Sequence, residues 1–124
     1  MDNKEFKEQF KKRLYAFIIE LVKVVERLPK NDELCKVADN QIIRSVTSIG
    51  ANYIEAQAAS SRKDFTNFLH HSLKSANESK FWLALLRDTN KGDEDKINML
   101  LKELAEISNS LASSILTLKG KRKL

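Results

Sequence analysis

The chain has 124 residues, of which 42% are hydrophobic and 31% charged, and its formal net charge is +5. A chain of this length forms one domain and buries a core without needing a metal or a disulfide. Only three glycines and one proline are present, too few for a domain of many strands and tight turns. The composition therefore favours an all-α fold in a single domain, residues 1–124.

Three features indicate the compartment. The single cysteine, Cys35, excludes an internal disulfide and fits a reducing environment. The charged N-terminal residues lack the apolar segment of a signal peptide. No apolar run approaches the roughly 18 residues of a membrane span. We therefore expect a cytoplasmic protein.

The first predicted helix covers about residues 4–28. Apolar side chains recur every three or four positions from Phe6 to Leu28, which is the pattern of a helix that buries one face. Pro29 ends this helix, because the residue before a proline is biased out of the helical region. Asn31 or Asp32 is a suitable N-cap for a second helix, which runs to about residue 59.

The second predicted helix, about residues 32–59, carries two apolar stripes. Beside the main stripe lies another, turned by about 100°, which consists of Ile43, Thr47, Gly50 and Ile54. The small Thr47 and Gly50 would let another backbone come close. Contact with a neighbouring subunit and an unusually broad internal face both explain this stripe.

The third and fourth predicted helices cover about residues 62–90 and 94–118. Ser61 followed by Asp64 resembles a capping box, and Gly92 suits a left-handed C-cap. In the fourth helix, apolar residues alternate steps of four and three from Ile97 to Leu118, as in a bundle seam. Residues 119–124 are predicted to form a basic tail. Because short turns join long helices, we predict an antiparallel up-down four-helix bundle.

No catalytic or metal site is visible in the sequence. His70 and His71 are adjacent, so on a helix they point about 100° apart and cannot face one ion together. Cys35 has no second cysteine with which to form a redox motif, and no Gly-rich loop precedes a helix. The chain is therefore predicted not to be an enzyme and to need no cofactor.

A polar group in the second helix is the most distinctive feature of the sequence. Spacings of three and four residues place most of the group on one face, beside the buried stripe. Polar groups near a core need hydrogen-bond partners, which predicts a structural network or a subunit interface. A site for a small ligand or a nucleotide is the alternative. The group consists of Arg44, Ser45, Ser48, Gly50, Asn52 and Glu55.

The same helix carries the residues of a known family. The run from Arg44 to Ala56, RSVTSIGANYIEA, resembles the signature of the four-helix-bundle proteins called the 23S ribosomal-RNA intervening-sequence protein family. The resemblance continues in SRKDF at residues 61–65 and in ANESKFWL at residues 76–83, and the turn at residues 28–31 is also similar. The chain is identified as a member over about residues 5–118.

The resemblance implies a small bacterial bundle. Some members of the family are encoded in insertions within large-subunit ribosomal RNA genes. The family is structurally similar to the accessory variability determinant protein of diversity-generating retroelements, a pentameric barrel that binds nucleic acid beside a reverse transcriptase. The resemblance thus implies a homopentamer that binds RNA or DNA through a basic surface without catalysis. The alternative is an oligomeric scaffold that recruits a partner such as a reverse transcriptase, without contacting nucleic acid.

Positive charge is concentrated in the two ends of the chain. Residues 1–30 carry a net +3 and residues 91–124 a net +2, whereas residues 31–90 are neutral. Phosphate contact explains this distribution, and so does solubility alone. No exposed stacking aromatic is expected, because Phe6, Phe65 and Phe81 fit core stripes. The candidate phosphate contacts are Lys11, Lys12, Arg13, Arg62, Lys63, Lys119, Lys121, Arg122 and Lys123.

Overall fold

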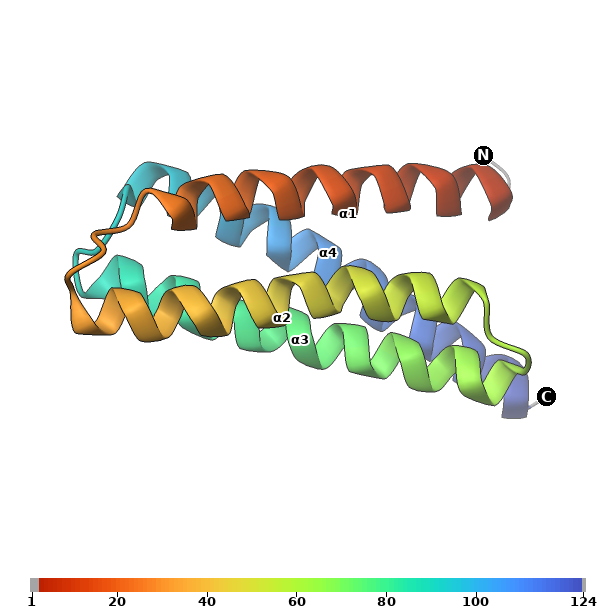
Figure 1. Ribbon diagram of the computed structural model, residues 1–124. Coiled ribbons are helices and arrows are strands. Elements are labelled where there is room, and N and C mark those ends of the chain that lie inside the picture. The colour runs from red at the N-terminus through yellow and green to blue at the C-terminus, as the bar shows by residue number, and fades with distance from the viewer. Residues whose placement is uncertain (1–2, 124) are drawn as a thin grey trace.

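The computed structural model shows four helices joined by short turns (Figure 1). The structure describes residues 3–123, and the side chains among them as far as residue 120. The helices are α1 (Asn3–Glu26), α2 (Glu33–Gln57), α3 (Arg62–Asp88) and α4 (Glu94–Lys123), and no strand occurs between residues 3 and 123. Successive helices run in opposite directions, which confirms the predicted all-α bundle.

The end of α4 differs from the prediction. The helix continues to Lys123 instead of stopping near Leu118, so residues 119–123 extend the helix rather than forming a separate tail. Lysine and arginine are good helix formers, and the single Gly120 costs only about 1 kcal/mol. The side chains of Lys121, Arg122 and Lys123 lie outside the described residues.

Two helix starts follow from local sequence. Asp32 is the N-cap of α2, and its side chain accepts a hydrogen bond of 2.9 Å from the backbone N–H of Cys35. Ser61 caps α3 and accepts from the N–H of Asp64 at 3.1 Å. The capping box at α3 is only half formed, because the Asp64 carboxylate accepts from the Ser60 hydroxyl at 3.4 Å instead.

The end of α3 uses a residue that the sequence analysis did not single out. Asn90 adopts a left-handed conformation with φ of 59°, and the N–H of Lys91 donates to the Leu86 carbonyl at 2.8 Å. This bond, with a second from Asn90 to the Arg87 carbonyl, closes the helix as a Schellman motif. The predicted Gly92 is also left-handed, at φ of 81°, but lies two residues farther on, in the turn to α4.

The core is one continuous cluster to which all four helices contribute. Leu21, Ile42, Leu83 and Leu104 represent the four helices in it, and each is fully buried. Helices α2 and α3 are the most closely packed pair. Between them the hydroxyls of Ser45 and Ser79 lie 2.8 Å apart, and Ser72 donates to the Ile49 carbonyl at 2.8 Å. Small hydrogen-bonded serines therefore allow these two helices to approach closely without leaving polar atoms unpaired.

An ion pair joins the two turns at the end of the bundle where α2 begins. The ammonium group of Lys91, after α3, donates to the carboxylate of Asp32, before α2. This hydrogen bond, followed by the one from the Cys35 N–H, lowers the pKa of Asp32 to about 2. The N-cap of α2 is thus also the point where the α3–α4 turn is held.

The depressed pKa predicts a specific acid sensitivity. An unfolded aspartate has a pKa of about 3.9, so ionised Asp32 stabilises the fold above about pH 4, and this stabilisation is lost as the pH falls toward 2. In a Lys91→Met variant the pKa of Asp32 should rise toward its ordinary value, and the free energy of unfolding should depend less on pH between 4 and 2. Denaturant unfolding at pH 2, 3, 4 and 5 measures this difference. Lys102→Met, which removes an exposed lysine elsewhere, should keep the parent pH dependence; equal slopes for both variants would contradict the assignment.

Candidate nucleic-acid interface

The fold brings three separate parts of the chain to one end of the bundle. At this end lie the start of α1, the α2–α3 turn and the end of α4 (Figure 1). The other two turns lie at the opposite end. We call residues 3–12, 55–65 and 110–123 the basic end. By sequence it holds ten Lys and Arg and four Asp and Glu, whereas the rest of the chain holds twelve and thirteen. The net positive charge of the protein therefore lies at this end.

Most of the predicted phosphate contacts belong to the basic end. Lys11 and Lys12 are exposed on α1, and Arg62 and Lys63 are exposed in the first turn of α3. Lys119 is exposed near the end of α4. Sequence positions more than fifty residues apart thus share one end, an arrangement that the linear charge pattern alone did not specify.

Among the predicted contacts whose side chains the structure describes, Arg13 differs from the others because it has partners within the chain. Its guanidinium donates to the carboxylates of Glu103 and Glu106 on α4. The pKa of Arg13 is raised, chiefly by the hydrogen bond to Glu103, although partial desolvation lowers it. A phosphate would have to displace two carboxylates from this side chain. Arg13 therefore ties α1 to α4 and is the weakest of the phosphate candidates.

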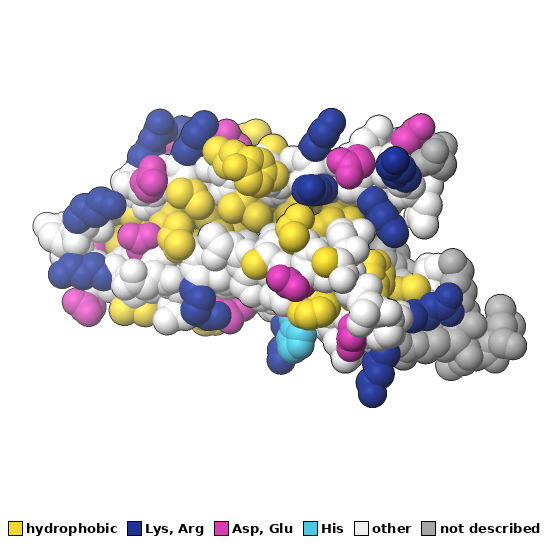
Figure 2. All heavy atoms as spheres, turned by 45° about the vertical axis from the view of Figure 1, so that its right-hand side comes forward, with side chains coloured by type: hydrophobic (Ala, Val, Ile, Leu, Met, Phe, Trp, Pro, Cys, Tyr) yellow, Lys and Arg dark blue, Asp and Glu magenta, His cyan; other side chains and the backbone are white. Residues whose placement is uncertain are grey.

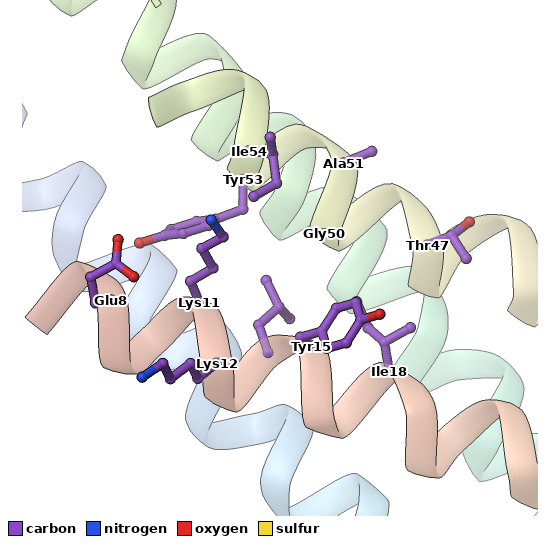
Figure 3. Close-up of a pocket in the computed structure, with 11 residues that line it drawn as sticks. Glu8, Lys11, Lys12, Tyr15, Ile18, Thr47, Gly50, Ala51, Tyr53 and Ile54 are labelled. Carbon is purple, nitrogen blue, oxygen red and sulfur yellow. The ribbon is translucent and has the colours of Figure 1, made fainter. Parts of the chain in front are cut away.

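A groove between α1 and α2 adjoins the basic end (Figure 3). Its volume is about 590 Å³ and its wall is predominantly apolar. Tyr15 and Ile54 line it and are 69% and 46% exposed, large fractions for apolar side chains. Lys11 and Lys12 belong to its wall as well, and in Figure 3 the Lys11 side chain extends toward Tyr53 on α2. Figure 2 shows hydrophobic side chains along the seam below α1, the uppermost helix in that view, with Lys and Arg around them.

The second stripe of α2 faces this groove, and its members have two different roles. A Cβ atom added to Gly50 would lie 2.9 Å from Cδ1 of Ile18, so the missing side chain lets α1 of the same chain come close. Thr47 and Ile54 are exposed. The broad internal face therefore explains Gly50, whereas Thr47 and Ile54 remain available to a partner.

Comparison with known proteins identifies the family. The profile of the family described as 23S rRNA-intervening sequence protein matches residues 7–113. The chain belongs to this family. It is also similar to the crystal structure of a protein with unknown function from the S23 ribosomal protein family of Bacteroides thetaiotaomicron VPI-5482. The two are 38% identical, the match covers 86% of this chain and 97% of that one, and the TM-score is 0.73. Comparison with curated proteins gave no match.

The polar group of α2 forms contacts with α3. Arg44 donates to Gln41 at 3.0 Å and pairs with Glu78. Ser75 donates to the Ser48 hydroxyl at 3.0 Å, and the Asn52 amide donates to the Ser48 carbonyl and hydroxyl, both at 2.9 Å. The remaining members are Ser45, which bonds Ser79 in the core, Gly50 in the groove, and Glu55, which is exposed.

Beside this network the surface is hollowed by about 510 Å³, with His71 and Lys74 among the lining residues. The polar side chains of the network already hydrogen-bond one another across α2 and α3, so the network has a structural role. The region is less suited to binding an anion than the basic end, because Arg44 is paired with a carboxylate.

Two aromatic side chains expected in the core are exposed. Phe6 is 46% exposed and Phe81 58% exposed, whereas Phe10 and Phe17 are buried. Phe6 continues the apolar stripe of α1, but it lies in the first turn, where it lines an open cavity between α1 and α4. The periodicity of a stripe gives the face of a helix but not where the neighbouring helices stop. Tyr15, on the rim of the groove, was missed because it lies outside the stripe.

Within the described residues, no group of three or more His, Cys, Asp or Glu side chains is placed to hold a metal ion. None of the helices, over the part of the chain that the structure covers, is both long and apolar enough to cross a bilayer.

The contact between Gly50 and Ile18 gives a testable prediction. Gly50→Leu should lower the free energy of unfolding by about 1–3 kcal/mol, because the added side chain meets Ile18 and pushes α1 outward. Ile18→Ala in the same chain should recover part of this loss. The measurement is a double-mutant cycle by urea unfolding. Ala51→Leu, one residue away on the exposed side, serves as the control and should change stability little; additive effects of Gly50→Leu and Ile18→Ala would argue against the contact.

Proposed function

We propose that this protein is a cytoplasmic, non-catalytic accessory protein that binds RNA or DNA as a homo-oligomer, contacting phosphates through the basic end. The observation that supports the proposal is the gathering of the net positive charge at one end by the antiparallel fold. A polyanion attracts such a surface through counterion release, and the contact reads backbone rather than sequence.

Self-association would strengthen this attraction. Each chain contributes a formal charge of +5, so five copies, the number that the likeness to the retroelement accessory protein implies, carry about +25. The α1–α2 groove supports association because it exposes Tyr15 and Ile54, and Ile19 of α1 is 39% exposed as well. Contiguous apolar surface of this kind on a soluble protein is typical of an interaction site. A second copy of the chain is the proposed occupant.

The same groove also supports a second function, an oligomeric scaffold that recruits a protein such as a reverse transcriptase. In that case the groove takes the partner and the basic end serves solubility. The pairing of Arg13 with two carboxylates favours this alternative, since it removes one cation from the proposed contact set. Binding to nucleic acid distinguishes the two functions.

Binding to nucleic acid should depend on salt and on the lysines of the basic end. The affinity of the purified protein for a labelled single-stranded RNA or DNA should fall steeply with salt. A Lys63→Gln, Lys119→Gln double variant, which leaves the α1–α2 groove unchanged, should bind more weakly. The slope of log Kd against log salt should fall by about two, one for each lost phosphate contact. Fluorescence anisotropy titrations at several salt concentrations measure both quantities.

The matched control removes two exposed lysines from the opposite end. Lys30→Gln with Lys36→Gln gives the same net charge as the test variant, so an effect of total charge alone would weaken both variants equally. A selective loss of binding in the Lys63, Lys119 variant supports the basic end. Equal losses would contradict the location, and a parent protein that ignores nucleic acid at low salt would favour the scaffold.

Self-association should depend on the α1–α2 groove. Ile54→Lys places a charge in the α1–α2 groove on an exposed position, so it should reduce the native mass without loss of helicity. Light scattering and circular dichroism measure the two. Met99→Lys introduces the same charge at a position on α4 that is 73% exposed, and should leave the mass unchanged. An Ile54→Lys protein with the parent mass would show that the groove is not the interface between copies.

A further inference from the structure

A further cavity, separate from the α1–α2 groove and from the hollow beside the polar network, opens at the basic end between the first turns of α1 and the last turns of α4. Its volume is about 480 Å³, within the range of sites for small molecules. The wall is mixed. Aromatic rings of Phe6, Phe65 and Tyr53 contribute to it from α1, α3 and α2, and α4 contributes a series of small polar side chains. It differs in this respect from the α1–α2 groove, whose wall is predominantly apolar.

The aromatic part of the cavity presents an open ring. Phe6 is 46% exposed and stacks on Phe10, with ring centroids 6.3 Å apart and planes inclined by 20°. Phe10 in turn contacts the ring of Tyr53 at 5.0 Å between centroids. The inner rings hold Phe6 in place, so a flat π-surface is available to a second ring. Core packing alone does not require an aromatic residue here.

Positive charge reaches the same cavity. The ammonium group of Lys7, which lines it, lies 5.6 Å from the centroid of the Phe65 ring, a cation–π contact that keeps the charge at the wall. A ligand whose ring enters the cavity would thus carry its negative group past the ammonium group of Lys7.

The α4 wall supplies hydrogen-bonding groups that the protein does not use. Asn109, Ser113 and Thr117 line the cavity at intervals of four residues, so they lie along one face of the helix. Over the described residues, none of these three side chains makes a hydrogen bond to another protein group. Amide and hydroxyl groups both donate and accept, and can therefore pair with the edge of a heterocyclic ring.

We propose that this cavity holds an unpaired base of a single-stranded nucleic acid, stacked on Phe6, with its edge toward the polar face of α4 and the adjoining phosphate near Lys7. The proposal rests on the proposed function, and extends it from phosphate contact to base contact. A flat ring, a polar edge and an attached anion are the three features that the wall complements. A paired base is stacked within its helix and cannot enter, so the occupant is single-stranded.

The test compares two oligonucleotides of equal length, one of natural single-stranded sequence and one made entirely of abasic units. Both carry the same phosphates, so phosphate contact alone gives equal affinities. We expect the natural oligonucleotide to bind more tightly. Phe6→Leu, which keeps the side chain apolar but removes the ring, should weaken binding of the natural oligonucleotide by roughly five- to a hundredfold, the range for loss of one stacking partner. Its affinity for the abasic oligonucleotide and its salt slope should not change.

Phe81→Leu is the matched control, because Phe81 is also an exposed phenylalanine, on α3, but does not line the cavity. Circular dichroism and native mass establish that each variant folds and assembles as the parent does. Unchanged binding by Phe6→Leu, or equal affinity of the parent for both oligonucleotides, would overturn the base pocket while leaving phosphate binding intact. Failure of both oligonucleotides to bind the parent at low salt would instead overturn the proposed function on which the pocket rests.

Discussion

The close packing of α2 against α3 is the constraint on which the rest of the structure depends. Helices approach closely only where the side chains between them are small, and here Ser45, Ser72, Ala76 and Ser79 are all buried. Hydroxyls in such a place need partners, which they find across the interface and in nearby backbone carbonyls. Because the pair is antiparallel, its turn fixes which end of the bundle receives the start of α1 and the end of α4. The basic end is a consequence of this topology.

Helix α1 is seated less tightly than the α2–α3 pair, and both the groove and the cavity follow from this. Its contact with α2 includes Gly50, which receives Ile18, and the ring contact of Phe10 with Tyr53. Its contact with α4 includes the Arg13 ion pairs at the surface. Toward its first turn, α1 is covered by fewer neighbours, so Phe6 is exposed. Space between helices at the margin of a bundle is where a ligand or a second subunit can bind without disturbing the core.

The local features of the fold could be predicted from the sequence because their causes are local. Pro29 and Asp32 mark the break between the first two helices, and Ser61 marks the start of the third. The family could be predicted too, because the residues that resemble it lie in short continuous stretches of the sequence, in and around α2 and α3. The extension of α4 past Gly120 was missed because one glycine lowers helix propensity without ending a helix.

The candidate site was less predictable because its causes are not local. The lysines of the basic end were identified as charged, but only the antiparallel topology shows that they share an end. Arg13 pairs with carboxylates ninety and ninety-three positions away, which no spacing rule indicates. The exposure of Phe6 depends on the open space between the first turns of α1 and the last turns of α4, and Gly50 meets Ile18 only because of how α1 is seated. Each of these features is fixed by a contact between helices.

The gathering of positive charge at one end of the bundle affects the stability of the protein. Like charges gathered at one end repel one another and disfavour the compact chain, whereas the same residues spread over four helices would cost less. In the proposed assembly, several copies would increase this repulsion unless the basic ends lay apart or met a polyanion. The apolar groove and the basic end would then act in opposite directions, the first favouring assembly and the second opposing it. A nucleic acid would resolve this opposition, because its phosphates would neutralise the basic end while the groove held the subunits together.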